Sequence, residues 1–322
     1  SLPARDKAAL LAWLDAGRPE GNPADAPLPR RFPGTWAIGQ PDLVVPIPKP
    51  IQVKATGTMP YQNVIAETRL TTDRWVQAVE IQPTAREVVH HVLAFVRTPA
   101  KEGGRPSRAG DEERGGFFAA YVPGNDSVIY PEGFAKFLPA GSSLKFQIHY
   151  TPNGTATRDQ VRLGLRFASA PPRHVVRVIG LVNPLLQIPP GAANHEEEAA
   201  IPILKPAQVL GFLPHMHVRG KAFRYESILA DGTVRTLLDV PRYDFNWQLS
   251  YRYAEPLSLP VGSRLRARGW FDNSNQNTAN PDPARTVRWG PQTTDEMMLG
   301  YVEYFFPDEK PATVATRKIA SP

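Results

Sequence analysis

The chain has 322 residues, a formal net charge of +6 and no cysteine. A chain of this length can bury one large core or two ordinary ones, and no disulfide supports that core. Its basic residues are scattered, without the Lys/Arg block and interleaved aromatics of nucleic-acid-binding proteins, and no apolar run approaches the roughly 18 residues of a membrane helix. We therefore expect no nucleic acid partner and no membrane span.

Residues 1–44 are predicted to form a helix followed by a linker. The spacing of apolar residues predicts a helix from Ala4 to Ala16, and the proline-rich stretch from Pro19 to Pro33 is typical of an extended linker. Residues 8–17 resemble the last helix of a c-type cytochrome domain, but the segment has no Cys-x-x-Cys-His haem motif. A truncated cytochrome remnant and an ordinary docking helix therefore stay equally open.

The remainder of the sequence is predicted to be all-β and duplicated. The chain's 35 prolines and 24 glycines separate short apolar runs, which favours many strands joined by turns. Residues 138–144 (LPAGSSL) and 259–265 (LPVGSRL) are near copies, and each precedes a strand-like run, so that His149 aligns with Trp270. We predict two antiparallel, jelly-roll-like β-sandwich domains side by side, residues 45–172 and 173–322.

Five of the seven histidines lie in three strand-like segments: His90 and His91, then His149, then His215 and His217. Imidazoles on apolar strands are costly to bury unless a proton partner or a metal satisfies them. Three such groups in a chain without cysteine indicate copper.

Strand geometry divides these histidines into two sets. Residues two apart share a strand face, so His215 and His217 can hold one ion together. His90 and His91 are adjacent and can share an ion only where the strand bulges or ends, with His149 as the natural third ligand. For the pair at 215 and 217 the best remaining donor is a methionine, and two imidazoles with a thioether suit Cu(I) better than zinc or magnesium.

The order of these motifs resembles the copper type II, ascorbate-dependent monooxygenases, which include the peptidylglycine α-hydroxylating and dopamine β-hydroxylating enzymes. The resemblance extends from about Val45 to Phe306. It is carried by four motifs in the family's order: His90-His91, Gln147-Ile148-His149-Tyr150, His215-Met216-His217 and Asp295-Glu296-Met297.

The resemblance implies a monooxygenase with two copper ions per chain. An electron-transfer copper would be held by His90, His91 and His149, and an oxygen-activating copper by His215, His217 and Met297. The implied partners are O2, a small organic substrate, and an external electron donor, either ascorbate or a cytochrome c-like domain. The given chain shows no signal peptide, so a periplasmic or secreted location is expected from the resemblance alone.

Several residues near these motifs are expected to matter for the substrate. Alternation places Gln147 on the face of His149 and Tyr301 on the face of Met297, so both are expected to line the cleft between the domains. Peptide-amidating members carry an arginine two positions before the His-x-His pair, where this chain has Leu213, which cannot grip a carboxylate. We therefore expect an apolar or aromatic substrate, with Arg219 either as an alternative anion grip or as a surface residue.

Other interpretations remain. A copper-binding or storage protein without turnover would keep the same ligands, and a β-sandwich interaction domain would use the histidines only structurally. Residues 243–248 either supply aromatics and amides to a substrate near the second domain or form a strand edge with packed aromatics, and the strand edge is favoured. His174 and His195 are expected to lack partners, with His195 in a solvated loop.

Overall fold

The computed structural model describes residues 2–26, 35–98 and 111–311. The chain forms two compact units, Ser1–Thr35 and Trp36–Pro322. The first unit contains helix α1 (Ala4–Asp15), within one residue of the predicted helix, and a 3-10 turn, η1 (Pro23–Asp25). No residue of α1 is buried, and no helix of the described residues is long and apolar enough to cross a membrane.

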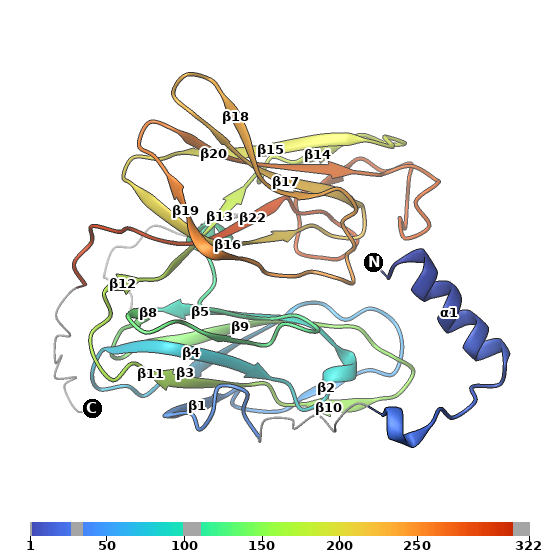
Figure 1. Ribbon diagram of the computed structural model, residues 1–322, viewed down its shortest axis with the longest axis horizontal. Helices are drawn as coiled ribbons and strands as arrows, with labels where there is room; N and C mark the ends of the chain where they lie inside the picture. Colours follow the sequence, from blue (N-terminus) through green and yellow to red (C-terminus); the bar gives the residue numbers. More distant parts are fainter. Residues whose placement is uncertain (1, 27–34, 99–110, 312–322) are drawn as a thin grey trace. The chain divides into compact units, whose positions relative to one another are not determined.

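The second unit begins with a pair of sheets that share one hydrophobic core (Figure 1). The larger sheet has the order β1 (Leu43–Pro46), β11 (Arg162–Phe167), β4 (Arg74–Gln82), β8 (Phe134–Leu138) and β12 (His174–Val175), with β7 (Ser127–Ile129) paired to β4. The smaller has the order β3 (Gln62–Glu67), β9 (Ser143–Tyr150), β5 (Val89–Arg97) and β6 (Ala119–Tyr121). Strands β2 (Ile51–Val53) and β10 (Thr157–Asp159) pair separately, and η2 (Arg86–Val88) precedes β5.

A second pair of sheets follows, with its own core. One sheet has the order β13 (Arg177–Val182), β22 (Leu299–Phe305), β16 (Ala207–His215) and β19 (Tyr251–Leu259). The other has the order β15 (His195–Pro202), β20 (Arg264–Phe271), β17 (Gly220–Ile228) and β18 (Val234–Val240). Strands β14 (Gln187–Ile188) and β21 (Val287–Arg288) form a small ladder, and α2 (Asp111–Gly115) precedes β6.

Alternating apolar residues explain why each sheet has one inward face. In β9, Leu144, Phe146 and Ile148 are fully buried in the first core, and the side chains between them point the other way. The prediction of an all-β chain is thus confirmed. The structure shows four larger sheets with two small ladders; the jelly-roll description and the boundary at residue 172 stay predictions.

A third apolar cluster joins the two pairs of sheets. Leu93 and Phe95 of β5 pack against Leu213 of β16 and against Leu299 and Tyr301 of β22. A buried ion pair also crosses this contact, between Lys136 Nζ of β8 and Glu303 Oε1 of β22 at 3.5 Å. The outward face of β5 and β9 is therefore covered by the second pair of sheets, and three of the five clustered histidines lie on these two strands.

Candidate metal centres

His90, His91 and His149 converge because strand β5 bulges. Val89 pairs with Tyr150 and His91 pairs with His149, so His90 is an extra residue in the ladder. The bulge that the adjacent histidines required is confirmed. The ligand nitrogens of the three side chains all lie within 4.8 Å of one another, and the two Nδ1 atoms of His90 and His91 are 3.1 Å apart.

Burial keeps these three imidazoles neutral. Desolvation, together with neighbouring histidines, lowers the pKa of His90 to about 4 and that of His149 to about 3. The pKa of His91 is lowered well below its usual value by the same causes. The Nδ1 atom of His149 is buried without a hydrogen-bond partner. Neutral imidazoles with converging nitrogens, one of them unsatisfied, fit a bound metal ion.

His215 and His217 form the second set at the end of β16. The Nδ1 atom of His215 lies 2.6 Å from Gln248 Oε1, whose amide is oriented because its Nε2 donates to the Phe245 carbonyl. The Nδ1 atom of His217 lies 3.3 Å from the Asp295 carbonyl, while its Nε2 is buried without a partner. Both Nδ1 atoms face acceptors and carry the proton, so both Nε2 atoms have free lone pairs, as metal ligands require.

Desolvation also keeps this second pair neutral. It lowers the pKa of His215 to about 4, against a hydrogen bond to Gln248 that raises it, and it lowers the pKa of His217 well below its usual value. The two ring centroids are 5.3 Å apart. Met216, between them, is fully buried in the second core and points away, as alternation predicts.

Glu296 connects the backbone at Met297 with the backbone at His217 through hydrogen bonds. Its Oε2 accepts the backbone N–H groups of His217 at 2.8 Å and Met297 at 3.2 Å, and its Oε1 accepts that of Arg219 at 2.7 Å. Burial raises the pKa of Glu296 to about 8, while the three N–H donors act to lower it. One buried carboxylate thus fixes Met297 beside His217.

The two neighbouring methionines have separate environments. Met297 belongs to the apolar cluster between the pairs of sheets, whereas Met298 is fully buried in the second core. The two side chains therefore lie in different apolar clusters, and Met297 as the copper ligand stays a prediction.

The expected substrate residues lie in a closed contact rather than an open cleft. Tyr301 is buried, its hydroxyl has no partner, and its ring meets Phe117 edge-on at 4.9 Å. Leu213, its cross-strand neighbour, is also buried, and the cavity beside both has a volume of only about 40 Å³. Gln147 lies half-buried on the strand face of His149, as predicted.

The two histidine sets are in contact with each other. The ring centroids of His91 and His215 are 5.7 Å apart. Phe245 stacks on His90 at 4.3 Å, although its segment is part of the second pair of sheets. A cavity of about 460 Å³ borders His90, His149 and Phe245, and it is the larger opening beside the histidines.

Four residues of this region were not predicted from the sequence as residues of the site. Tyr61 stacks on His149 at 4.7 Å, and burial raises its pKa above the usual range. Thr293 Oγ1 lies 3.1 Å from His149 Nε2. Phe245 and Gln248 belong to the segment 243–248, which was interpreted as a strand edge; its mixture of aromatics and amides was the available signal. Tyr61 and Thr293 had no such signal.

Two expectations require correction. Arg219 is fully buried, its Nε donating to Asn273 Oδ1 at 2.9 Å and its Nη1 to the Thr294 carbonyl at 3.0 Å, so it is not a surface residue. His195 begins β15 and has a partner, Glu197, at 3.0 Å. His174, as expected, has no hydrogen-bond partner at its Nδ1, and its ring packs against those of Phe134 and Phe305.

Comparison with known proteins gives one family match. Residues 175–319 match the family described as copper type II ascorbate-dependent monooxygenase, C-terminal domain. This span includes His215, His217 and Met297 and excludes the first histidine set. No curated protein matches the sequence significantly.

Solved structures give only remote likenesses. The major capsid protein P2 of bacteriophage PM2 is 10% identical, with 80% of this chain and 97% of that chain covered and a TM-score of 0.34. Allantoicase from Saccharomyces cerevisiae is 9% identical, with 79% and 80% covered and a TM-score of 0.24. Likenesses this low carry no argument about this chain.

Proposed function

We propose that this protein is a copper-dependent monooxygenase, because residues 175–319 match the C-terminal domain of the copper type II, ascorbate-dependent monooxygenase family. It hydroxylates a C–H bond of a small organic substrate with O2 and an external reductant. The observation that carries the proposal is the convergence of five buried or half-buried histidines, held neutral by burial, from both pairs of sheets.

Two copper ions are part of the proposal. His90, His91 and His149 would hold the first, and His215, His217 and Met297 the second. Bound copper supplies one-electron chemistry towards dioxygen, and a thioether ligand favours the reduced Cu(I) state. We assign the first set to electron delivery and the second to oxygen activation.

The remaining residues position and shield these ligands. Gln248 holds the proton of His215 on Nδ1, and the Asp295 carbonyl does the same for His217. Such outer partners fix ring orientation and ligand basicity. The packing of Leu93, Phe95 and Leu299 excludes bulk water on the Met297 side.

We propose an apolar or aromatic substrate that binds beside Leu213 and Tyr301, with Gln147 nearby. Leu213 and Tyr301 are surrounded by apolar side chains, and two of the three guanidinium nitrogens of Arg219 already donate to Asn273 and Thr294. A cavity of about 40 Å³ holds little more than one water molecule, so a substrate reaches this place only when the contact between β5 and β22 opens.

The closed contact also supports a second candidate, a copper-binding or storage protein without turnover. Ascorbate-dependent O2 consumption in the presence of neutral aromatic substrates distinguishes the two, because a storage protein would bind copper and consume no O2. A periplasmic or secreted location and an electron donor of either kind, ascorbate or a cytochrome c-like domain, belong to the first candidate.

X-ray absorption on the reduced, copper-loaded protein tests the ligand assignment. We expect sulfur in the shell of one of the two copper ions, and Met297→Ile should remove it. Met298→Ile is the matched control, since Met298 lies in the second core. Loss of the sulfur signal in the control variant instead would refute the assignment.

Glycine-extended peptides test the substrate class. With Leu213 in place of an arginine, such a peptide lacks a charge-assisted contact of roughly 1.5–3 kcal/mol, which is about ten- to a hundred-fold in affinity. Neutral aromatic substrates should therefore be turned over in preference. Efficient peptide turnover by the unaltered protein would contradict this specificity while leaving the copper assignment intact.

A further inference from the structure

An apolar pocket of about 300 Å³ lies between the two sheets of the second pair. Its walls include Ile201, Ile203, Val209, Leu265, Val302 and Phe306. It opens at the Ala207 end of β16, whereas His215 ends the same strand eight residues later. At about 3.3 Å per residue this separation is roughly 26 Å, so the pocket is distinct from the histidine sets.

The pocket is larger than a packing defect. Well-packed cores leave few voids beyond the size of a water molecule, and this volume would hold roughly ten waters at their bulk volume. It lies where β15 ends at Pro202 and β16 begins at Ala207, so the connection between them forms the rim. Leu204 on that connection is 79% exposed. Size and lining match those of small-molecule sites.

One positive charge stands at the rim. Among the described residues, Lys205 is the only charged one that lines the pocket, and its Nζ lies 5.8 Å from the centre of the Phe306 ring. Within the described part of the chain no carboxylate lies at ion-pair distance from Lys205. Arg177 also approaches the Phe306 ring, at 5.6 Å, but its guanidinium is paired with Glu309. Lys205 is thus available to an anionic group of a ligand.

We propose that this pocket binds an elongated apolar molecule that ends in a carboxylate. The apolar part would lie between the two sheets, where burial of apolar surface drives binding, and the carboxylate would meet the ammonium group of Lys205. The site is independent of the copper chemistry, because none of its lining residues belongs to either histidine set.

Calorimetric titration of the copper-loaded full chain with decanoate, decan-1-ol and decyltrimethylammonium tests the proposal. Decanoate should bind most tightly and the cationic amphiphile most weakly. Lys205→Met should weaken decanoate binding about tenfold, the loss expected for one charge-assisted contact, and leave decan-1-ol unchanged. Lys54→Met, at an exposed lysine directly after β2, is the control and should change neither.

Filling the pocket gives the complementary test. Val209→Phe should abolish binding of decanoate and decan-1-ol alike. Methyl NMR of the unaltered protein locates the ligand without any substitution, through shifts of Ile201, Ile203 and Leu265. No decanoate binding, shifts confined to other methyl groups, or an unchanged decanoate affinity in Lys205→Met would each overturn the proposal.

Discussion

Strands β9 and β20 each follow a turn of the same kind, but they carry different side chains on their outward faces. Gly141 and Gly262 both have positive φ, 67° and 83°. In each turn a buried serine hydroxyl donates to the carbonyl of the preceding proline, Ser142 to Pro139 at 2.7 Å and Ser263 to Pro260 at 2.6 Å. The inward residues of both following strands are apolar and fill the two cores.

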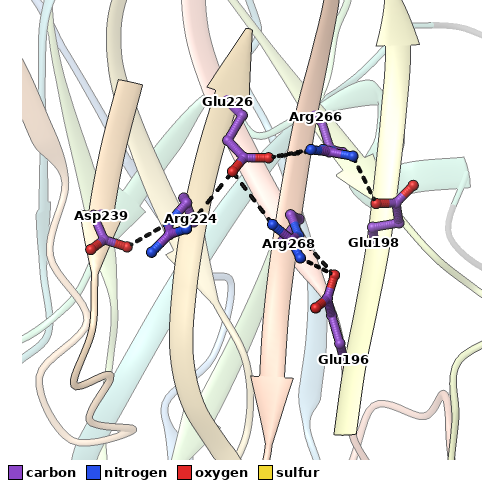
Figure 2. Close-up of polar contacts among 7 residues, drawn as sticks. All are labelled: Glu196, Glu198, Arg224, Glu226, Asp239, Arg266 and Arg268. Atoms are coloured by element: carbon purple, nitrogen blue, oxygen red, sulfur yellow. Dashed lines mark hydrogen bonds and ion pairs between the residues drawn. The ribbon is translucent and has the colours of Figure 1, made fainter. Parts of the chain in front are cut away.

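The outward faces of the two strands carry different residues. The outward side chains of β9 are Lys145, Gln147 and His149, and those at the equivalent positions of β20 are Arg266, Arg268 and Trp270. Figure 2 shows that the β20 face carries a ladder of ion pairs across the sheet. The Glu226 carboxylate forms ion pairs with Arg266 at 2.7 Å and with Arg268 at 3.5 Å. Arg266 also pairs with Glu198, and Arg268 pairs with Glu196.

The two outward faces differ because only that of β9 is covered by another pair of sheets. The second pair of sheets covers the sheet face that carries His149, where burial keeps imidazoles neutral and available as ligands. Arg266 and Arg268 of β20 remain about one-fifth exposed, so water and paired carboxylates satisfy their charges. The same local structure thus supports a metal centre or an ion-pair ladder, depending on its neighbour.

The largest effect is expected from His149→Ala. Loss of an outer partner of a metal ligand typically costs about 10–100-fold in affinity, so loss of a ligand itself should weaken copper binding at the first set further. Trp270→Ala, at the equivalent position of β20, is the matched control and should retain both copper ions. Copper counted after dialysis against a graded chelator series measures the effect.

The same variant separates the two sets. In reduced His149→Ala protein, carbon monoxide should still bind at the second set, whereas His215→Ala should abolish its binding. Equal loss of carbon monoxide binding in both variants would mean that the two sets act as one site.

The sequence predicted what depends on local rules. Strand alternation placed Gln147 on the face of His149, and one ion shared by the adjacent His90 and His91 called for a bulge or a strand end, of which β5 has the bulge. It could not show that Phe245 stacks on His90, because that contact joins segments far apart in the chain. Nor could it show that Arg219 is buried, since its acceptors come from Asn273 and Thr294, more than 50 residues away.

The second largest effect is a loss of stability at acidic pH in the metal-free protein. The folded-state pKa values of His149 and His215, about 3 and about 4, lie below the usual 6.5. Their contribution is therefore fully present above pH 6.5 and is lost as pH falls towards these values. The slope approaches about 1.4 kcal/mol per pH unit for each histidine that must stay neutral.

Urea unfolding between pH 7.5 and 5 measures this slope. His149→Ala should reduce it, and copper should move the loss of stability to lower pH, because bound metal favours the neutral imidazoles. Equal stability of the metal-free protein across this range would show that these histidines are not held neutral by the fold.

A smaller effect on stability is expected from the ion pairs on the outward face of β20. The Glu226 side chain is only 4% exposed and joins Arg266 to Arg268, so Glu226→Gln leaves two partly buried arginines short of a partner. We expect a loss of about 1–3 kcal/mol in unfolding free energy with copper binding unchanged. Asp239→Asn, at the more exposed end of the ladder, should cost less than about 1 kcal/mol. High salt should reduce the Asp239 effect more than the Glu226 effect, because buried pairs are screened less, and it should leave the histidine slope in place.

The smallest effect on stability is expected from the similar turns that precede β9 and β20. Ser142 and Ser263 are almost fully buried, and each hydroxyl makes the same hydrogen bond to a proline carbonyl two residues before the turn glycine. Ser142→Ala and Ser263→Ala should therefore each cost about 1 kcal/mol, the usual net value of one such bond. Chemical denaturation of the two variants and of the double variant measures these costs, which should add because the turns lie in separate cores. A cost confined to one turn would mean that the likeness of the two segments does not extend to their energetics, and that the neighbouring sheets, rather than the turn itself, stabilise the other.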